Sequence, residues 1–254
     1  MNKWIIKQYA TSSELASHVI QYALSNDDIG ESNSVLDLGC GTGMLAMGCA
    51  IVGTKSIICV DCDEEAINIA KENVEEMGFE LIDEDDEDDS PCVFEFILAE
   101  VKHVPAVSTN VGGNDRRQRG KGGRGKGRGK GRHGHHQPQQ QQNIIPLSLN
   151  ENDDDGIPIS SNCVDTVLTN PPFGTKHNAG IDVTFLKTAI RLATKAVYSF
   201  HKSSTSSYLI KIVQSWGYEA EVVAQMKFDI PKMYKFHKKD EVDVEVDLIR
   251  VSLV

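Results

Sequence analysis

Apolar positions along the chain follow two alternating patterns, one recurring at helical spacing and the other forming short continuous runs. A capping-box spacing from Thr11 to Glu14 opens the first helical pattern, which continues through Leu24. Later helical patterns predict helices over 44–52, 63–77, 182–194 and 204–216. The apolar runs predict strands over 34–37, 56–61, 93–99, 164–169, 195–200, 219–228 and 242–253.

Seven predicted strands that alternate with helices are typical of a doubly wound α/β sheet in which most strands are parallel. No helical pattern separates the last two strands, so we expect the last strand to be antiparallel. A chain of 254 residues, 40% of them hydrophobic, is long enough to bury one such core.

Residues 103–156 interrupt the alternation. They contain a Gly/Lys/Arg repeat over 120–134, a glutamine tract over 139–142 and three aspartates, Asp153 to Asp155. Such a composition cannot bury enough apolar surface to offset the entropy of ordering, so we predict a disordered low-complexity insertion within a single domain over 1–254. The basic tract has three possible roles: contacts with RNA phosphates, a nuclear or nucleolar localisation signal, or a solvated spacer without function.

Charge is unevenly divided along the chain. The formal net charge is −11, yet residues 115–132 hold nine Lys or Arg and one Asp, and residues 83–89 are all acidic. An acidic body does not attract nucleic acid by itself, so an RNA substrate would need basic loops or a partner. No apolar run reaches the roughly 18 residues of a membrane helix, and no secretory segment opens the chain, so we expect an intracellular protein without membrane association. Cys59 and Cys62 form a C-x-x-C without a second ligand pair, so no metal site is predicted.

A glycine-rich turn follows the first predicted strand, with the sequence Asp37-Leu38-Gly39-Cys40-Gly41-Thr42-Gly43. Glycines let the backbone approach a ligand closely, and this spacing differs from the G-x-G-x-x-G of nicotinamide sites. Asp37 suits an ammonium group, and Asp61, which ends the second strand, suits ribose hydroxyls. S-adenosylmethionine carries both groups, so we predict it as the cofactor. Glu100, after the third strand, is either an acceptor for the cofactor's adenine amino group or a solvated acid.

The fourth predicted strand leads directly into Asn170-Pro171-Pro172-Phe173. The two prolines fix the backbone, so the Pro171 carbonyl is aimed rigidly. Together with the Asn170 side-chain oxygen, it can accept the two hydrogens of a planar amine, which favours charge build-up on the nitrogen as it attacks a methyl group. Phe173 can stack on the acceptor. These four residues predict a catalytic site for adenine N6, guanine N2 or a glutamine amide.

Longer stretches extend the similarity to known proteins over most of the chain outside the insertion: 8–11, 37–43, 170–176, 185–189, 198–205, 234–239 and 242–250. In them the sequence resembles the methyltransferase-like protein five family of eukaryotes, which N6-methylates one adenosine of small-subunit (18S) ribosomal RNA. The stretches over 234–239 and 242–250 go beyond the four-residue motif and favour this family over guanine or protein methyltransferases.

The resemblance implies a Rossmann-like class I S-adenosylmethionine methyltransferase fold and an N6-adenosine methyltransferase that acts on ribosomal RNA. It implies that Gln8 and Thr11 close over the cofactor. The remaining cofactor residues that it implies are Gly39, Thr42, Met44 and Asp61, with Glu100 where the family carries an aspartate. It also implies a heterodimer with the small zinc-binding methyltransferase activator protein, which fits an outermost position for the strand over 93–99.

Five basic residues are expected at the catalytic rim as RNA contacts, with ordinary surface positions as the alternative: Lys176, Lys202, Lys235, His237 and Lys238. The chain departs from the family in having seven residues ahead of Gln8, in Glu100, in the acidic run over 83–89 and in the insertion. We expect a location in nucleus and cytoplasm. The alternatives to an RNA adenosine N6-methyltransferase are a protein glutamine or guanine-N2 methyltransferase with the same four-residue site, and a catalytically silent RNA-binding assembly factor.

Overall fold

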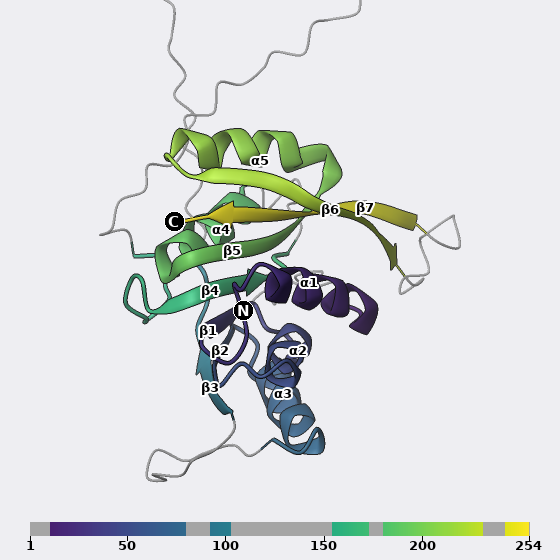
Figure 1. The fold of residues 1–254 in the computed structure, drawn as a ribbon, viewed down its shortest axis with the longest axis vertical. Coiled ribbons are helices and arrows are strands. Elements are labelled where there is room, and N and C mark those ends of the chain that lie inside the picture. The colour runs from purple at the N-terminus through teal and green to yellow at the C-terminus, as the bar shows by residue number, and fades with distance from the viewer. Residues whose placement is uncertain (1–10, 80–91, 103–153, 173–179, 231–241, 254) are drawn as a thin grey trace, which may run out of the picture. The chain divides into compact units, whose positions relative to one another are not determined.

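The computed structural model describes residues 11–79, 92–102, 154–172, 180–230 and 242–253. They form one sheet with the strand order β3-β2-β1-β4-β5-β7-β6 (Figure 1). Its strands are β1 (Ser34–Leu38), β2 (Ser56–Asp61), β3 (Val93–Leu98), β4 (Val164–Thr169), β5 (Ala193–Lys202), β6 (Glu219–Ile230) and β7 (Val242–Ser252). β1 to β5 are parallel, whereas β7 runs antiparallel to β5 and β6, which confirms the predicted seven-stranded, mostly parallel sheet with an antiparallel last strand.

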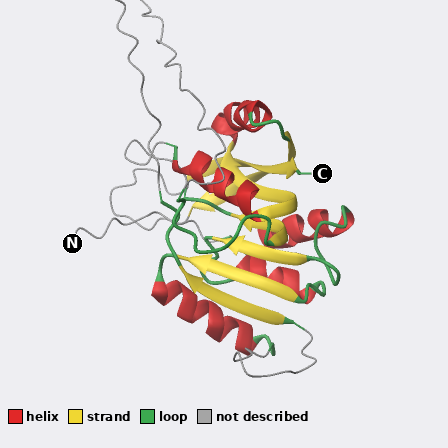
Figure 2. Cartoon of the chain, turned by 90° about the vertical axis from the view of Figure 1, so that its left-hand side faces the viewer, coloured by secondary structure: helices red, strands yellow, loops and turns green. Residues whose placement is uncertain are grey.

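Helices lie on both sides of the sheet (Figure 2). They are α1 (Ser13–Ser25), α2 (Met44–Ile51), α3 (Glu64–Glu76), α4 (Ile181–Leu192) and α5 (Ser203–Ser215). The crossovers through α2 and α3 run in one direction along the sheet and the crossover through α4 runs in the other, so right-handed connections place α4 on the opposite face. None of the described helices is long and apolar enough to cross a membrane.

Helix α1 begins one residue later than the capping-box pattern predicts. Ser12 is the N-cap, and its hydroxyl accepts a hydrogen bond from the Leu15 amide at 3.3 Å. The predicted capping box from Thr11 to Glu14 is therefore wrong, because the adjacent Ser12 supplies the same acceptor one position further on. This shift leaves the Thr11 side chain available for a contact outside the helix.

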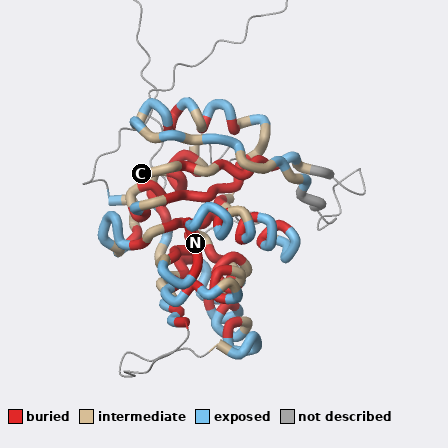
Figure 3. The backbone as a smooth tube through the Cα atoms, in the orientation of Figure 1, coloured by how far each residue is buried: buried red, intermediate tan, exposed pale blue. Residues whose placement is uncertain are grey.

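The core is built around the central strands, which Figure 3 shows as mostly buried. Val35, Leu36 and Leu38 of β1 and Val167 and Leu168 of β4 are fully buried. Strands covered by helices on both faces are apolar at consecutive positions, which is why these segments appear in the sequence as continuous apolar runs.

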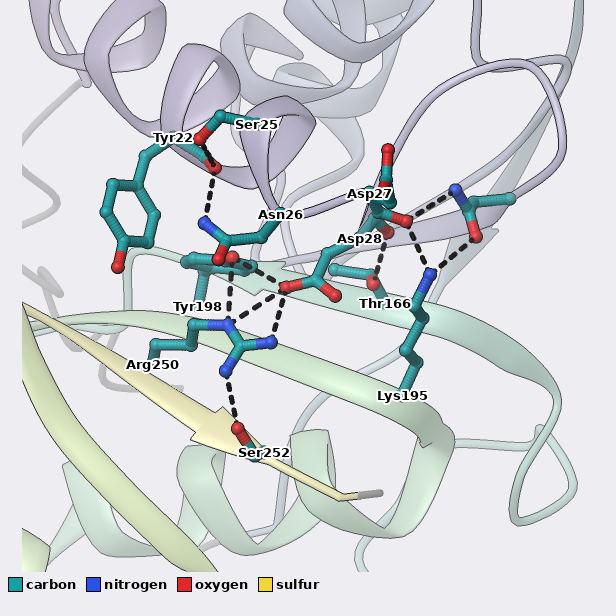
Figure 4. A network of polar contacts seen from close by, with 11 residues as sticks. Tyr22, Ser25, Asn26, Asp27, Asp28, Thr166, Lys195, Tyr198, Arg250 and Ser252 are labelled. Atoms are coloured by element: carbon teal, nitrogen blue, oxygen red, sulfur yellow. Dashed lines mark hydrogen bonds and ion pairs between the residues drawn. The ribbon is translucent and has the colours of Figure 1, made fainter.

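A buried polar network holds the loop that enters β1 (Figure 4). The Asp28 carboxylate accepts hydrogen bonds from the Tyr198 hydroxyl at 2.7 Å and from Arg250 Nε at 2.9 Å, and Arg250 Nη2 lies 2.8 Å from it as an ion pair. The Thr166 hydroxyl donates to the Asp28 carbonyl at 2.6 Å. The loop before β1 is thereby tied to β4, β5 and β7, which fixes β1 relative to its neighbours.

Most of the predicted insertion, residues 103–153, lies outside the described residues, so its disorder stays a prediction. The chain segments on either side of it meet: the Lys102 amide donates to the Asp155 carbonyl at 2.8 Å. A Cβ on Gly156 would lie 2.3 Å from the Glu100 carbonyl oxygen, so the two backbones are in close contact. Arg191 of α4 holds the Asp155 carboxylate through Nε and Nη2 at 2.8 and 3.0 Å. The chain therefore departs and returns at one place, just after β3.

Candidate active site

The glycine turn between β1 and α2 adopts a backbone that requires glycine. Gly39, Gly41 and Gly43 have φ angles of +77°, +53° and +84°, which L side chains rarely adopt. A Cβ on Gly39 would lie 3.3 Å from the ring of Phe185, and one on Gly43 would lie 3.3 Å from the Ala70 Cβ. Apart from Gly41 and its two chain neighbours, no described residue has an atom within 4 Å of a Cβ placed on Gly41. The middle of the turn therefore offers open space beside its backbone.

Hydrogen bonds from β2 hold this turn. The amides of Gly39 and Cys40 donate to the Val60 carbonyl at 2.8 and 3.0 Å. The Gly41 amide donates to Asp61 Oδ2 at 2.8 Å, and Asp61 Oδ1 accepts from the Asp63 amide at 3.0 Å. Asp61, the predicted ribose acceptor, is buried and also shapes the turn. Each carboxylate oxygen has two lone pairs, so these bonds leave Asp61 capacity for ligand hydroxyls.

Asp37 lies at the end of β1 with an unsatisfied buried oxygen. Its Oδ2 accepts a hydrogen bond from the Ala46 amide at 3.2 Å. Its Oδ1 has no hydrogen-bond partner within the described part of the chain, although the residue is only 1% exposed. Burial raises the pKa of Asp37 to about 7, against the bond from Ala46, and the Asp61 carboxylate adds to the rise. A buried, unpaired acceptor of this kind fits the predicted contact with a ligand's ammonium group.

The other predicted cofactor residues that the structure describes gather at the same edge. Thr42 is exposed in the turn, and Met44 is the partly buried first residue of α2. Glu100 is exposed and lies two residues beyond the end of β3, because the strand stops at Leu98 rather than at Ala99 as predicted. The Ala99 amide donates to the Asp61 carbonyl at 2.9 Å, which keeps this loop beside the end of β2.

β4 lies directly beside β1, and the two motifs leave these strands at the same level. Leu38 and Thr169 are partners in the strand register, and the Thr169 hydroxyl donates to the Leu38 carbonyl at 2.7 Å. The next residue on β1 is Gly39 and the next on β4 is Asn170. Both strands point the same way, so the glycine turn and the Asn-Pro-Pro segment begin side by side at one edge of the sheet.

Thr11 contacts the predicted catalytic asparagine. The Asn170 Nδ2 donates to the Thr11 hydroxyl at 3.0 Å, across 159 residues of sequence. This bond fixes the orientation of the amide, and Oδ1 is the end of it that can accept a hydrogen. Pro171 is buried and Pro172 is partly buried. The segment before α1 thereby helps to orient the amide of Asn170.

Several predicted site residues lie outside the described residues, and their roles stay predictions: Gln8, Phe173, Lys176, Lys235, His237 and Lys238. Lys202 is described. It is the partly buried last residue of β5, two residues beyond the predicted end of that strand at residue 200. Because β5 is parallel to β4, Lys202 lies at the same edge of the sheet as Asn170.

The structure adds residues that sequence reasoning missed. Asn73 of α3 donates from Nδ2 to the Thr42 carbonyl at 3.0 Å. Ser199 Oγ and His201 Nε2 form a buried hydrogen bond of 2.7 Å at the end of β5, and Asp247 is the register partner of His201 on β7. Burial lowers the pKa of His201 to about 3, against the opposing effect of Asp247. The available signal was the alternation of polar residues in β5, whereas nothing local marks Asn73.

Comparisons of fold and motif place the chain among methyltransferases. A family model described as ribosomal protein L11 methyltransferase (PrmA) matches residues 20–100, which include the glycine turn and Asp61 but not Asn170. Among solved structures, the chain is similar to PH1948 from Pyrococcus horikoshii, with a TM-score of 0.62 and 24% identity over 97% of this chain and 87% of that one. It is also similar to Thermoplasma acidophilum 1320, with a TM-score of 0.53 and 19% identity over 97% and 92%. These structures support the fold.

Relatives that align with this chain over most of their length extend the similarity across both motifs. The chain is 34% identical to the rRNA N(6)-adenosine-methyltransferase METTL5 of Danio rerio, over 98% of this chain and 90% of that protein. It is 31% identical to the rRNA N(6)-adenosine-methyltransferase Mettl5 of Drosophila melanogaster, over 99% and 88%. This confirms the family resemblance found in the sequence: the chain belongs to the METTL5 family of rRNA N(6)-adenosine-methyltransferases.

Proposed function

We propose that this protein uses S-adenosylmethionine to methylate the N6 amine of an adenosine in small-subunit (18S) ribosomal RNA. The observation that carries the proposal is the adjacency of β1 and β4, which start the glycine turn and the Asn170 segment from register partners. The relatives, which are named rRNA N(6)-adenosine-methyltransferases, support the same reaction.

The cofactor would be held by acids at the ends of β1, β2 and β3. When bound, S-adenosylmethionine supplies a methyl group activated by its sulfonium. The buried Asp37 Oδ1 would accept a hydrogen bond from the ammonium group. Asp61 would accept hydrogen bonds from the ribose hydroxyls while it retains its hydrogen bond from the Gly41 amide. The exposed carboxylate of Glu100 is at the same edge for the adenine amino group.

The acceptor would be held by Asn170 and Pro171. An adenine amine is a weak nucleophile because its lone pair is delocalised into the ring. Asn170 Oδ1 and the Pro171 carbonyl accept its two hydrogens, which favours positive charge on the nitrogen in the transition state. Thr11 keeps the amide in the required orientation by accepting from Nδ2. The methylated nitrogen is cationic before it loses a proton, so the site needs no strong base.

A transfer assay with labelled cofactor tests the proposal. We expect label in the adenosine of 18S ribosomal RNA, and we expect Asn170→Ala to lower the transfer rate by about 100-fold or more, as loss of a transition-state hydrogen bond does. Asn68→Ala, on the exposed face of α3, is the matched control and should retain the rate. Mapping the methylated nucleoside identifies the acceptor atom.

Three outcomes would contradict the proposal. Label on protein acceptors alone would favour a glutamine methyltransferase, and label on guanine would favour a guanine-N2 enzyme. Absence of cofactor binding by calorimetry, together with absence of turnover, would favour an RNA-binding assembly factor.

We further propose that β3 pairs with the small zinc-binding methyltransferase activator protein that the family resemblance implies. β3 is an edge strand of the described sheet and pairs there with β2. Its Val93 and Leu98 side chains are 43% and 56% exposed. An edge strand with exposed apolar side chains is suited to strand addition by a partner.

A further inference from the structure

Helix α3 contacts the glycine turn through a side chain with no evident role in the helix itself. The Asn73 Nδ2 donates to the Thr42 carbonyl at 3.0 Å, although the two residues are 31 positions apart. Asn73 lies inside α3, where asparagine forms helix less readily than alanine. A local reason for asparagine at this position is therefore lacking, and its contact with the turn supplies one.

A second contact on the same face of α3 brings the turn against the helix. A Cβ on Gly43 would lie 3.3 Å from the Ala70 Cβ and 3.7 Å from its Cα, so the turn rests directly on α3. Ala70 and Asn73 are three residues apart and share one face of the helix. Ala70 limits how close the turn can come, and Asn73 holds the turn at that contact.

The opposite flank of α3 is fixed to the sheet. Lys71 Nζ lies 5.5 Å from the ring centroid of Phe96 in β3. Phe79, just after α3, packs against Phe94 with ring centroids 5.8 Å apart. α3 is thus anchored to the edge of the sheet on one side and contacts the turn on the other.

The hydrogen bonds from β2 reach the first part of the turn, Gly39 to Gly41, whereas Asn73 holds the second part at Thr42. The open space at Gly41 lies between these two anchors. We propose that Asn73 is a positioning residue for the cofactor: it fixes the Thr42 peptide so that the turn is already shaped to receive S-adenosylmethionine. This inference rests on the proposed function.

The test compares two asparagines of the same helix. Asn73→Ala and Asn73→Asp remove the donor, whereas Asn68→Ala and Asn68→Asp make the same changes at an exposed position. We measure the dissociation constant of S-adenosylmethionine by calorimetry, the KM for the cofactor and the rate at saturating cofactor. The Asn73 variants should bind cofactor about fivefold to tenfold more weakly than the Asn68 variants, as expected for one lost hydrogen bond.

Two further readouts separate positioning from a structural role. The rate at saturating cofactor should match that of the Asn68 variants, because Asn73 acts through its contact with the cofactor turn at Thr42. Melting temperatures without cofactor should also match those of the Asn68 variants. If wild-type protein binds no S-adenosylmethionine, the proposed function itself fails. If wild-type protein binds it and the Asn73 variants bind equally well, or if they lose thermal stability in proportion to affinity, the inference is wrong.

Discussion

Asp37 combines features that are unfavourable in the cofactor-free fold. It is buried, it has an unsatisfied oxygen, and its pKa is raised to about 7. In the unfolded chain the pKa of Asp37 is about 3.8. Ionising Asp37 in the folded state therefore costs stability, and this cost grows as pH rises from 3.8 to 7 and is constant above pH 7. The cost is on the order of 4 kcal/mol at most. An ammonium ligand would offset it.

Replacing Asp37 by Asn should therefore stabilise the protein and weaken cofactor binding. At pH 8 the free energy of unfolding of cofactor-free Asp37→Asn should exceed that of wild type, and at pH 4 the difference should shrink toward zero, as measured by urea unfolding. The dissociation constant of S-adenosylmethionine should rise at least tenfold in the variant at pH 8.

Wild-type affinity should also fall as pH drops below 7, because Asp37 becomes protonated, and the variant should lack this dependence. A variant that is less stable at pH 8, or that binds cofactor with wild-type affinity, would contradict this role.

Single residues were predictable where a short motif carries the chemistry. Asp37, Asp61 and Asn170 follow directly from the sequence around strand ends, and the structure brings them to one edge of the sheet. Asn73 and Thr169 could not be predicted in this way, because their contacts with Thr42 and Leu38 join distant parts of the chain. Their residue types carry no local signal.

At the scale of elements, the ends of strands and helices were the hardest to predict. β5 runs from Ala193 to Lys202, whereas the predicted range was 195–200. It begins earlier because α4 ends at Leu192, and it ends later because it continues through His201. His201 is polar, so the apolar pattern ends before it. In the structure its side chain is buried and paired with Ser199, which lets a polar residue extend an interior strand.

His201 should make β5 and β7 sensitive to acid. The unfolded chain binds a proton on histidine below about pH 6.5, whereas the folded state does not until about pH 3. Each unit of pH below 6.5 should therefore lower the free energy of unfolding by up to about 1.4 kcal/mol. Between pH 4 and 6.5 this slope opposes that of Asp37, so the two contributions largely cancel in wild type.

Two variants separate the opposing effects of Asp37 and His201 on the pH dependence of the free energy of unfolding. His201→Gln should become more stable as pH falls from 6.5 to 4, and Asp37→Asn should become less stable over the same range, as measured by urea unfolding at several pH values. Parallel pH profiles for both variants and wild type would show that neither group titrates as the structure indicates.

At the scale of the whole molecule, the alternation of strands and helices was enough to predict a seven-stranded, mostly parallel sheet. The outermost position of β3 was expected from the family resemblance, and the described sheet has β3 at its edge. The contact between Lys102 and Asp155 was not predictable, because low-complexity sequence carries no pairing signal. Nor was the Asp28 network, in which Arg250 comes from the last strand and Asp28 from the loop before the first (Figure 4).

The two edges of the sheet provide a test of the partner surface. Val93→Lys and Leu98→Lys place charge on β3, and we expect co-purification with the activator protein to be lost. Val222→Lys is the matched control, because Val222 is 37% exposed on β6 at the opposite edge. Loss of the heterodimer with Val222→Lys but not with the β3 variants would contradict the assignment.

The register between Leu38 and Thr169, together with their hydrogen bond, fixes how far apart the glycine turn and the Asn170 segment begin. Neighbouring strands are about 4.8 Å apart wherever their backbones pair. In the proposed reaction, the separation between methyl donor and methyl acceptor would thus be set by sheet geometry, because both loops leave neighbouring strands at the same level. The target adenosine would have to leave its stack to reach such a site, so we expect the accessibility of that base in folded RNA to govern the rate of the proposed reaction.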